Sequence, residues 1–195
     1  MSLLFTVISP PASTPVSVED CKEDLRIEDS FTDDDALISS YIYAAAKLAS
    51  EITGKKLINE TIKLSLSSFT TEIDLKFLPV ASITEIQYYD VDNVSQTLNV
   101  SDFYLYNYDQ EGCLVVKDST TLPATYSRRD AVNITFVAGY GTDGTNIPVT
   151  ILKAIRLIVA HWYENRSQSI IGFSVAEIPY GVEVLLGSER TGWVA

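Results

Sequence analysis

The hydrophobic pattern of this 195-residue chain changes its period twice, and that change limits the folds open to it. Over residues 33–53 the apolar side chains recur every three or four positions, as on one face of a helix. Over residues 59–137 they alternate, or gather in short aromatic and β-branched runs, which favours antiparallel strands. Helical spacing returns over residues 148–165. The pattern predicts an α+β fold, mainly a helical bundle of about four helices, with an inserted antiparallel β-sheet lobe.

Two further helices are expected to be short. Residues 18–25 follow Ser17, whose side chain suits a helix N-cap, and Asp20 stands three positions later, as in a capping box. Pro179 suits the start of a last helix over residues 180–186.

The start and end of the first long helix are also indicated. Thr32 or Asp33 is expected to cap it, and Asp34 and Asp35 would sit in its first turn, where the helix dipole favours negative charge. Gly54 stands where a left-handed residue would end it.

These elements predict three parts. Residues 1–16 hold several prolines and would form an extended N-terminal arm. Residues 17–58 and 138–195 together would form the helical core, and residues 59–137 the inserted β lobe.

The charge balance argues against a grip on nucleic acid. The chain has 26 acidic and 14 basic residues, a formal charge of −12. No cluster of Lys or Arg offers a basic patch, and a negative surface repels phosphate. Residues 148–195 are balanced in charge and are therefore candidates for contacts with other proteins.

Cysteine usage and the absence of apolar segments suggest where the chain is made. Cys21 and Cys113 stand alone in different contexts, which is typical of reduced thiols in the cytoplasm. The N-terminus lacks the basic residues of a signal peptide, and no apolar run is long enough for a membrane helix, so we expect no membrane partner.

His161, the only histidine, is the first candidate for catalysis. An imidazole acts as a base only when another group orients it, and the neighbour within reach on the same helix is Glu164. Such a pair is common on exposed helix surfaces, so we interpret His161 as a surface or interface residue and predict no catalytic site and no enzyme.

Metal and cofactor sites are not expected either. One His and two scattered Cys cannot form the usual nitrogen and sulfur sites, and the acidic run 33–35 lacks the spacing of a calcium loop. Gly139, Gly141 and Gly144 follow a strand and precede a helix, but their spacing fits a turn better than a phosphate-binding loop.

The helix over residues 148–165 and the segment after it carry apolar residues that lie outside the main apolar face of that helix. Leu157 and His161 lie on the side opposite that face. We predict an interface that also takes in residues of the following segment, although that segment could instead fold back on the chain's own sheet. Those residues are Ile170, Ile171, Phe173, Val175 and Ile178.

The end of the same helix should pack internally. Trp162 falls on the core face with Tyr163 beside it, and Arg166 is one turn beyond Trp162, at the distance of a cation–π contact.

The order of these motifs resembles the phage head-tail connector family that includes the gp6-like and phiE125 gp8-like proteins. Its members share a Leu-Arg-Ile helix end, an acidic cap, an Ala-rich helix ending at Thr-Gly, a strand ending in Gly-Tyr-Gly, a Pro-initiated long helix and a Pro-led last helix. Here these correspond to Leu25–Ile27, Asp34–Asp35, Ala44–Gly54, Gly139–Gly141, Pro148–Arg166 and Pro179–Arg190.

The resemblance implies a structural protein of a tailed phage or prophage, located in the virion at the head-tail junction and in the host cytoplasm during assembly. Its copies would form a ring, a dodecamer in the virion, that docks on the portal protein and joins the next neck or tail-completion protein. Double-stranded DNA would pass through an acidic channel without specific binding. By the same resemblance Pro179–Ala195 would contact the portal, with Trp193 as an anchor.

Two other functions are open from the residues alone. The Tyr-rich run Phe103–Asp109 could make the chain a monomeric module that binds a protein or polymer. A hydrolase using His161 is the weakest reading.

Overall fold

The structure is a computed structural model that describes residues 4–108, 111–166 and 180–190. The fold is α+β, as the sequence predicts. The emphasis on helices is not confirmed, because strands occupy nearly as much of the described chain as helices do. Many of these strands are short, and a short strand shows too little alternation to stand out in a sequence.

The chain divides into two compact units. Met1–Ala12 and Ile58–Thr142 form one, which we call the sheet unit, and Ser13–Leu57 and Asp143–Ala195 form the other, the helical unit.

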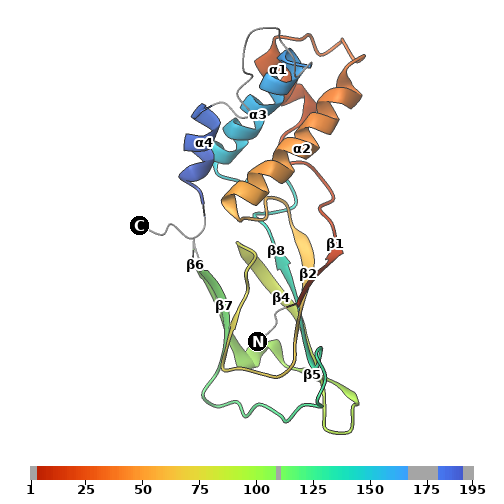
Figure 1. The fold of residues 1–195 in the computed structure, drawn as a ribbon, viewed down its shortest axis with the longest axis vertical. Helices are drawn as coiled ribbons and strands as arrows, with labels where there is room; N and C mark the ends of the chain where they lie inside the picture. The colour runs from red at the N-terminus through yellow and green to blue at the C-terminus, as the bar shows by residue number, and fades with distance from the viewer. Residues whose placement is uncertain (1–3, 109–110, 167–179, 191–195) are drawn as a thin grey trace, which may run out of the picture. The chain divides into compact units, whose positions relative to one another are not determined.

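Four helices in the described part of the helical unit lie within two residues of their expected positions. They are α1 (Val18–Leu25), α2 (Asp35–Thr53), α3 (Val149–Glu164) and α4 (Tyr180–Gly187) (Figure 1). The capping box of α1 is confirmed, because Ser17 Oγ accepts from the Asp20 backbone N–H while the Asp20 carboxylate accepts from the Ser17 backbone N–H. Gly54 ends α2 with a φ of 72°, as expected.

The expected cap of α2 is wrong. Asp34, rather than Thr32 or Asp33, occupies the N-cap position, and its side chain makes no capping hydrogen bond. Its carboxylate instead bonds residues from the end of α3, so a distant contact has replaced the local one.

Small and branched apolar residues build the core of the helical unit. α2 packs on α3, and α1 and α4 pack against both. Alanines let the two long helices approach closely, because they add little bulk between the backbones. The buried apolar residues of these helices are Cys21, Ile38, Ile42, Ala45, Ala49, Ile151, Ala154, Ile155, Ile158, Val159, Val182 and Leu186.

The sheet unit contains two antiparallel sheets in its described part. The first has five strands in the order β1–β2–β8–β4–β5, and the second has three in the order β3–β7–β6. Their bounds are β1 Leu4–Ser9, β2 Glu60–Leu66, β3 Glu72–Asp74, β4 Val80–Tyr89, β5 Ser95–Leu98, β6 Phe103–Tyr108, β7 Glu111–Val116 and β8 Val132–Ala138. A short 3₁₀ helix, Val100–Asp102, precedes β6.

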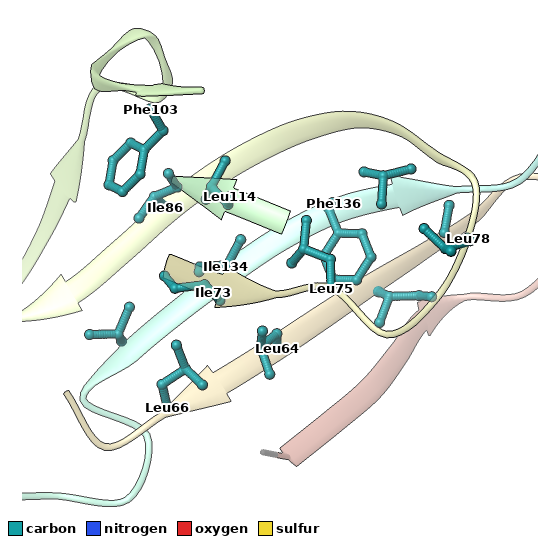
Figure 2. Packing of buried hydrophobic residues seen from close by; sticks show 14 residues of the cluster. Leu64, Leu66, Ile73, Leu75, Leu78, Ile86, Phe103, Leu114, Ile134 and Phe136 are labelled. Atoms are coloured by element: carbon teal, nitrogen blue, oxygen red, sulfur yellow. The ribbon is translucent and has the colours of Figure 1, made fainter. Parts of the chain in front are cut away.

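The register of β2 and β8 places their apolar residues on one face. Ile62 pairs with Phe136 and Leu64 with Ile134, and all four side chains are fully buried. Figure 2 shows Leu64 and Ile134 facing Ile73 of β3, which comes from the other sheet. The core of this unit therefore lies between its two sheets, and the alternation seen in the sequence marks the side that faces it.

The N-terminal segment differs from the expected arm. Leu4–Ser9 forms β1, which pairs with β2 in antiparallel register and belongs to the sheet unit. Phe5 packs edge-on against Phe77, with ring centroids 5.0 Å apart. Without β1, the backbone groups on that side of β2 would need another partner, because buried peptide groups are costly to leave unbonded.

Glycine is required at two turns that the sequence singled out. Gly139 has a φ of 141°, and a Cβ there would lie 2.6 Å from the backbone N of Asn59. A Cβ on Gly144 would lie 2.0 Å from the carbonyl oxygen of Pro15. Backbone geometry thus accounts for these glycines without any bound phosphate.

Candidate functional site

The exposed side of α3 brings two predicted interface residues together. Leu157 is 36% exposed and His161, one turn later, is partly exposed, while Ile158 and Val159 beside them are buried. Both side chains are therefore on the solvent side of α3 among the described residues.

His161 is held by the end of its own helix rather than by an acid. Asn165 Nδ2 lies 3.4 Å from His161 Nδ1 and donates to the His161 carbonyl oxygen at 2.9 Å. The amide therefore orients the ring and closes the helix end. No hydrogen bond with Glu164 is found within the described ranges, so the structure gives no support to a base activated by that carboxylate.

The end of α3 is joined to the start of α2 by one carboxylate. Asp34 Oδ2 accepts from Tyr163 Oη at 2.5 Å and from Arg166 Nη2 at 2.6 Å. These bonds, that of Tyr163 first and then that of Arg166, hold the pKa of Asp34 below its usual range. The same carboxylate raises the pKa of Tyr163, because it accepts the phenolic proton.

The expected contact between Arg166 and Trp162 is wrong. The Arg166 guanidinium lies over the ring of Tyr163, 4.4 Å from its centroid, whereas Trp162 meets Tyr41 of α2 edge-on at 6.0 Å. Trp162 packs toward α2, on the core face as expected. Arg166 instead lies over Tyr163 because its guanidinium bonds Asp34, the acid beside that tyrosine.

A second group of charges joins α1 to α3. Asp24 accepts from Arg156 at 2.7 Å and from Lys153 at 3.2 Å. Burial raises the pKa of Asp24, but the hydrogen bonds from the two bases outweigh it and the pKa stays below the usual value. Most of the basic groups of α3 are therefore used inside the chain, which leaves its surface without a basic patch for DNA.

Lys22 joins α1 to α2. Its side chain is only 4% exposed, and its Nζ lies 2.5 Å from Asp35 Oδ1. Because Asp34 and Asp35 both pair with basic groups of the helical unit, the acidic run is explained without calcium.

The described part of α4 is tied to the other helices through a polar contact at its end. Glu189 accepts from Thr150 Oγ1 at 2.6 Å and lies 3.4 Å from Lys55 Nζ. Val182 and Leu186 are buried, whereas Val184 is 54% exposed. One side of α4 therefore packs on the bundle and the other faces outward.

The remaining predicted interface residues lie outside the described residues. They are Ile170, Ile171, Phe173, Val175, Ile178 and Trp193.

Metal and thiol chemistry find no support in the part of the chain that the structure describes. No group of three His, Cys, Asp or Glu side chains there could hold a metal ion. Burial raises the pKa of Cys21 to about 11, with Arg156 opposing the shift, so this thiol stays protonated.

Among the described helices, none has the length and apolarity to cross a membrane.

Acidic side chains gather around α1. They line an open pocket of about 460 Å³, and no basic side chain is among its lining residues. Such a surface repels phosphate groups rather than binding them. The lining residues are Glu19, Asp20, Glu23, Ile27, Glu28 and Asp29.

The exposed aromatic residues of β6 are a feature that sequence reasoning assigned only to an alternative function. Tyr104 and Tyr106 are 51% and 40% exposed, and their rings lie 6.2 Å apart. Alternation along Phe103–Tyr108 could have indicated that Tyr104 and Tyr106 share an exposed face, because Phe103, on the opposite face of the strand, is buried.

Solved structures share this fold over almost the whole chain. A chain from the neck of an empty gene transfer agent particle, computed with C6 symmetry, matches with a TM-score of 0.79 and 24% identity, covering 98% of this chain and 97% of that one. A chain from the virion of the native particle matches with a TM-score of 0.77 at the same identity and coverage. A chain from the native neck with C12 symmetry matches with a TM-score of 0.73 and 24% identity, covering 100% and 98%.

Curated proteins give no match to this sequence. The family model described as "Head completion protein" matches residues 15–180, which is most of the chain. This confirms the resemblance to phage head-tail connectors, and the family is structural rather than enzymatic. The chain belongs to the head completion protein family.

Proposed function

We propose that this protein is a neck component of a tailed phage or a related particle and joins the DNA-filled head to the tail. The observation that carries the proposal is the family match over residues 15–180. The shared fold with chains from gene transfer agent necks supports it, because those chains are matched over nearly their full length. In this proposal the protein acts at the head-tail junction of the virion.

The proposal includes a closed ring. Chains of this fold occur in necks computed with C6 and C12 symmetry, and such symmetry requires unlike surfaces to meet head to tail around the axis. Leu157 and His161 would lie at or near a contact of this kind, with the apolar residues of 170–178 beside them.

Docking on a portal protein is the proposed role of the C-terminal end. The outward side of α4 carries Val184, while Val182 and Leu186 hold the helix on the bundle. A helix fixed in this way can present Val184 to a partner at little cost in entropy. Trp193 would be the anchor of this contact.

The acidity of the chain suits a channel through which DNA passes. A charge of −12 per copy, multiplied around a ring, repels the duplex and lets it move without sticking. In this view DNA is cargo, and the next neck or tail-completion protein binds the other end of the ring.

The test is the native mass of the purified protein, alone and mixed with a portal protein from the same particle. We expect rings, or a complex with the portal whose mass fits a ring. A protein that stays monomeric at high concentration and ignores the portal would contradict the proposal.

A second candidate is a monomeric binding module that uses the exposed Tyr104 and Tyr106 of β6. Aromatic side chains of this kind are common in recognition surfaces. A stable monomer whose binding is lost on replacing Tyr104 with Ala would favour it over the neck protein.

A further inference from the structure

The two sheets of the sheet unit have four outermost strands, and two of them carry the usual protection against pairing with another chain. β3 has only three residues, two of which are Glu72 and Asp74. β5 has four residues, and its first three are the polar Ser95, Gln96 and Thr97. Short length and polar or charged side chains are the means by which soluble proteins keep sheet edges unpaired.

β1 lacks this protection. It has six residues, and the chain carries no charged side chain before Glu19. Leu4 and Ile8 are 61% and 54% exposed. A register shift after Val7 bends the end of the strand and leaves its first four residues as a regular edge.

β6 is the other unprotected strand. It also has six residues without a charge, and it is the outermost strand of its sheet. Tyr104 is 51% and Leu105 36% exposed. Lys117 lies 4.7 Å from the Tyr104 ring and covers only one side of it.

We propose that β1 of one copy pairs with β6 of the next copy and that this strand pairing joins neighbours in the ring. The inference rests on the proposed ring and names its contact. A closed ring needs two unlike surfaces on each copy, and the chain offers two unlike unprotected edges on opposite sides of one unit (Figure 1).

The two edges suit each other chemically. They have the same length, and neither carries a charge that would have to be desolvated. Aliphatic side chains of β1 would lie beside tyrosines of β6, and aliphatic–aromatic pairs are among the more favourable cross-strand contacts. Strand pairing would also satisfy the outer backbone groups of both edges.

Cross-linking tests the contact directly. In a Cys113→Ser background, one protein would carry Thr6→Cys and a second Leu105→Cys, both near the strand centres, and a short bis-maleimide would tolerate a register shift of one residue. Cys21 is buried and would not react. We expect cross-linked dimers mainly in the mixture of the two proteins. Dimers of the Thr6→Cys protein alone would mean that β1 pairs with itself and would overturn the proposal.

A matched pair of lysine variants tests the energetic role of the edge. Leu4→Lys places a charge on the regular part of β1, and Thr97→Lys places one on the protected edge β5, where Thr97 is exposed. Leu4→Lys should raise the concentration needed for assembly at least about tenfold, because a buried lysine opposes strand pairing. Thr97→Lys should leave that concentration nearly unchanged.

The outcomes separate this inference from the proposed function. Rings that form without the mixed cross-link, and that tolerate Leu4→Lys, would overturn the strand pairing and leave the neck function intact. Mixed cross-links in open chains that never close would support the pairing and contradict the ring. A monomer without cross-links at high concentration would contradict both.

Discussion

Gly139 illustrates how one residue can depend on a contact far away in the sequence. It follows β8, and the chain at Asn59 passes so close that a Cβ at Gly139 would meet the backbone there at 2.6 Å. A φ of 141° adds to the constraint, because side chains rarely allow that conformation.

We expect Gly139→Ala to destabilise the protein by about 2–4 kcal/mol, since it combines backbone strain with a clash that cannot relax easily. Denaturant unfolding would measure the change. Gly181→Ala is the matched control, because a Cβ there meets nothing within 4 Å and the site lies in α4. That control should be neutral or slightly stabilising, and an equal loss in both variants would refute the argument.

Asp34 links the start of α2 to the end of α3 through its bonds to Tyr163 and Arg166. Its pKa is lowered in the folded state, so its contribution to stability is complete above the pKa of the unfolded chain, about 3.9, and is lost as the pH falls through the lower folded pKa.

Replacing Asp34 with Asn should therefore lower the Tm at neutral pH, and the difference from the wild type should shrink as the pH falls below about 3.9. Thermal unfolding followed from pH 7 to about pH 2 would show the convergence. Asp33→Asn is the control, because Asp33 is exposed, whereas Asp34 and Asp35 are the acids of the ion pairs described at the helix ends. A difference that stays constant over the whole pH range would show that charge is not the cause.

At the scale of elements, α4 is a short helix that needs its contacts with α2 and α3. Glu189, just after α4, supplies a polar contact. It accepts a hydrogen bond from Thr150 at the start of α3 and pairs with Lys55, whose side chain is only 10% exposed. An acid at a helix start also suits the helix dipole.

Glu189→Ala should cost about 2 kcal/mol, because it leaves a nearly buried ammonium group without its acid. The loss should appear in denaturant unfolding and in faster proteolysis near α4. Glu183→Ala, within α4 itself, is the control, since Glu183 is exposed, and it should change stability much less. A loss of similar size in both variants would mean that α4 merely needs negative charge.

At the scale of the whole molecule, the charge of −12 works against self-association. Copies in the proposed ring would repel one another, and added salt shortens the range of that repulsion to about 8 Å at physiological ionic strength. The contacts proposed between copies are apolar, so there is little electrostatic attraction between copies that salt could weaken.

We expect ring formation to strengthen when the ionic strength rises from about 0.01 M to about 0.15 M. Native mass measured over a concentration series at each salt level would show it. Weaker assembly at the higher ionic strength would instead indicate that ion pairs between copies hold the ring.

The interiors of the helices could be predicted from the sequence, and alternation marked β2 and β8 as strands, because these signals are local, whereas β1 was expected to belong to an arm. Ser17 and Asp20 cap a helix by themselves, and Gly54 ends one by its own conformation. The exposed side of α3 followed in the same way from its spacing, with Leu157 and His161 both on it. The partners of Arg166 and Asp34 could not be predicted, since they lie more than a hundred residues apart in the chain.

The sequence by itself determined the period of most segments and the family, which is structural rather than enzymatic, because these depend on residue type and order. Only the tertiary structure decided which strands pair: β8 lies between β2 and β4, and the N-terminal segment becomes β1 at an edge. Pairing depends on which apolar faces and backbone edges meet after collapse, and many registers are compatible with the same local pattern. That step also left β1 and β6 as the unprotected edges, a property that no local pattern contains.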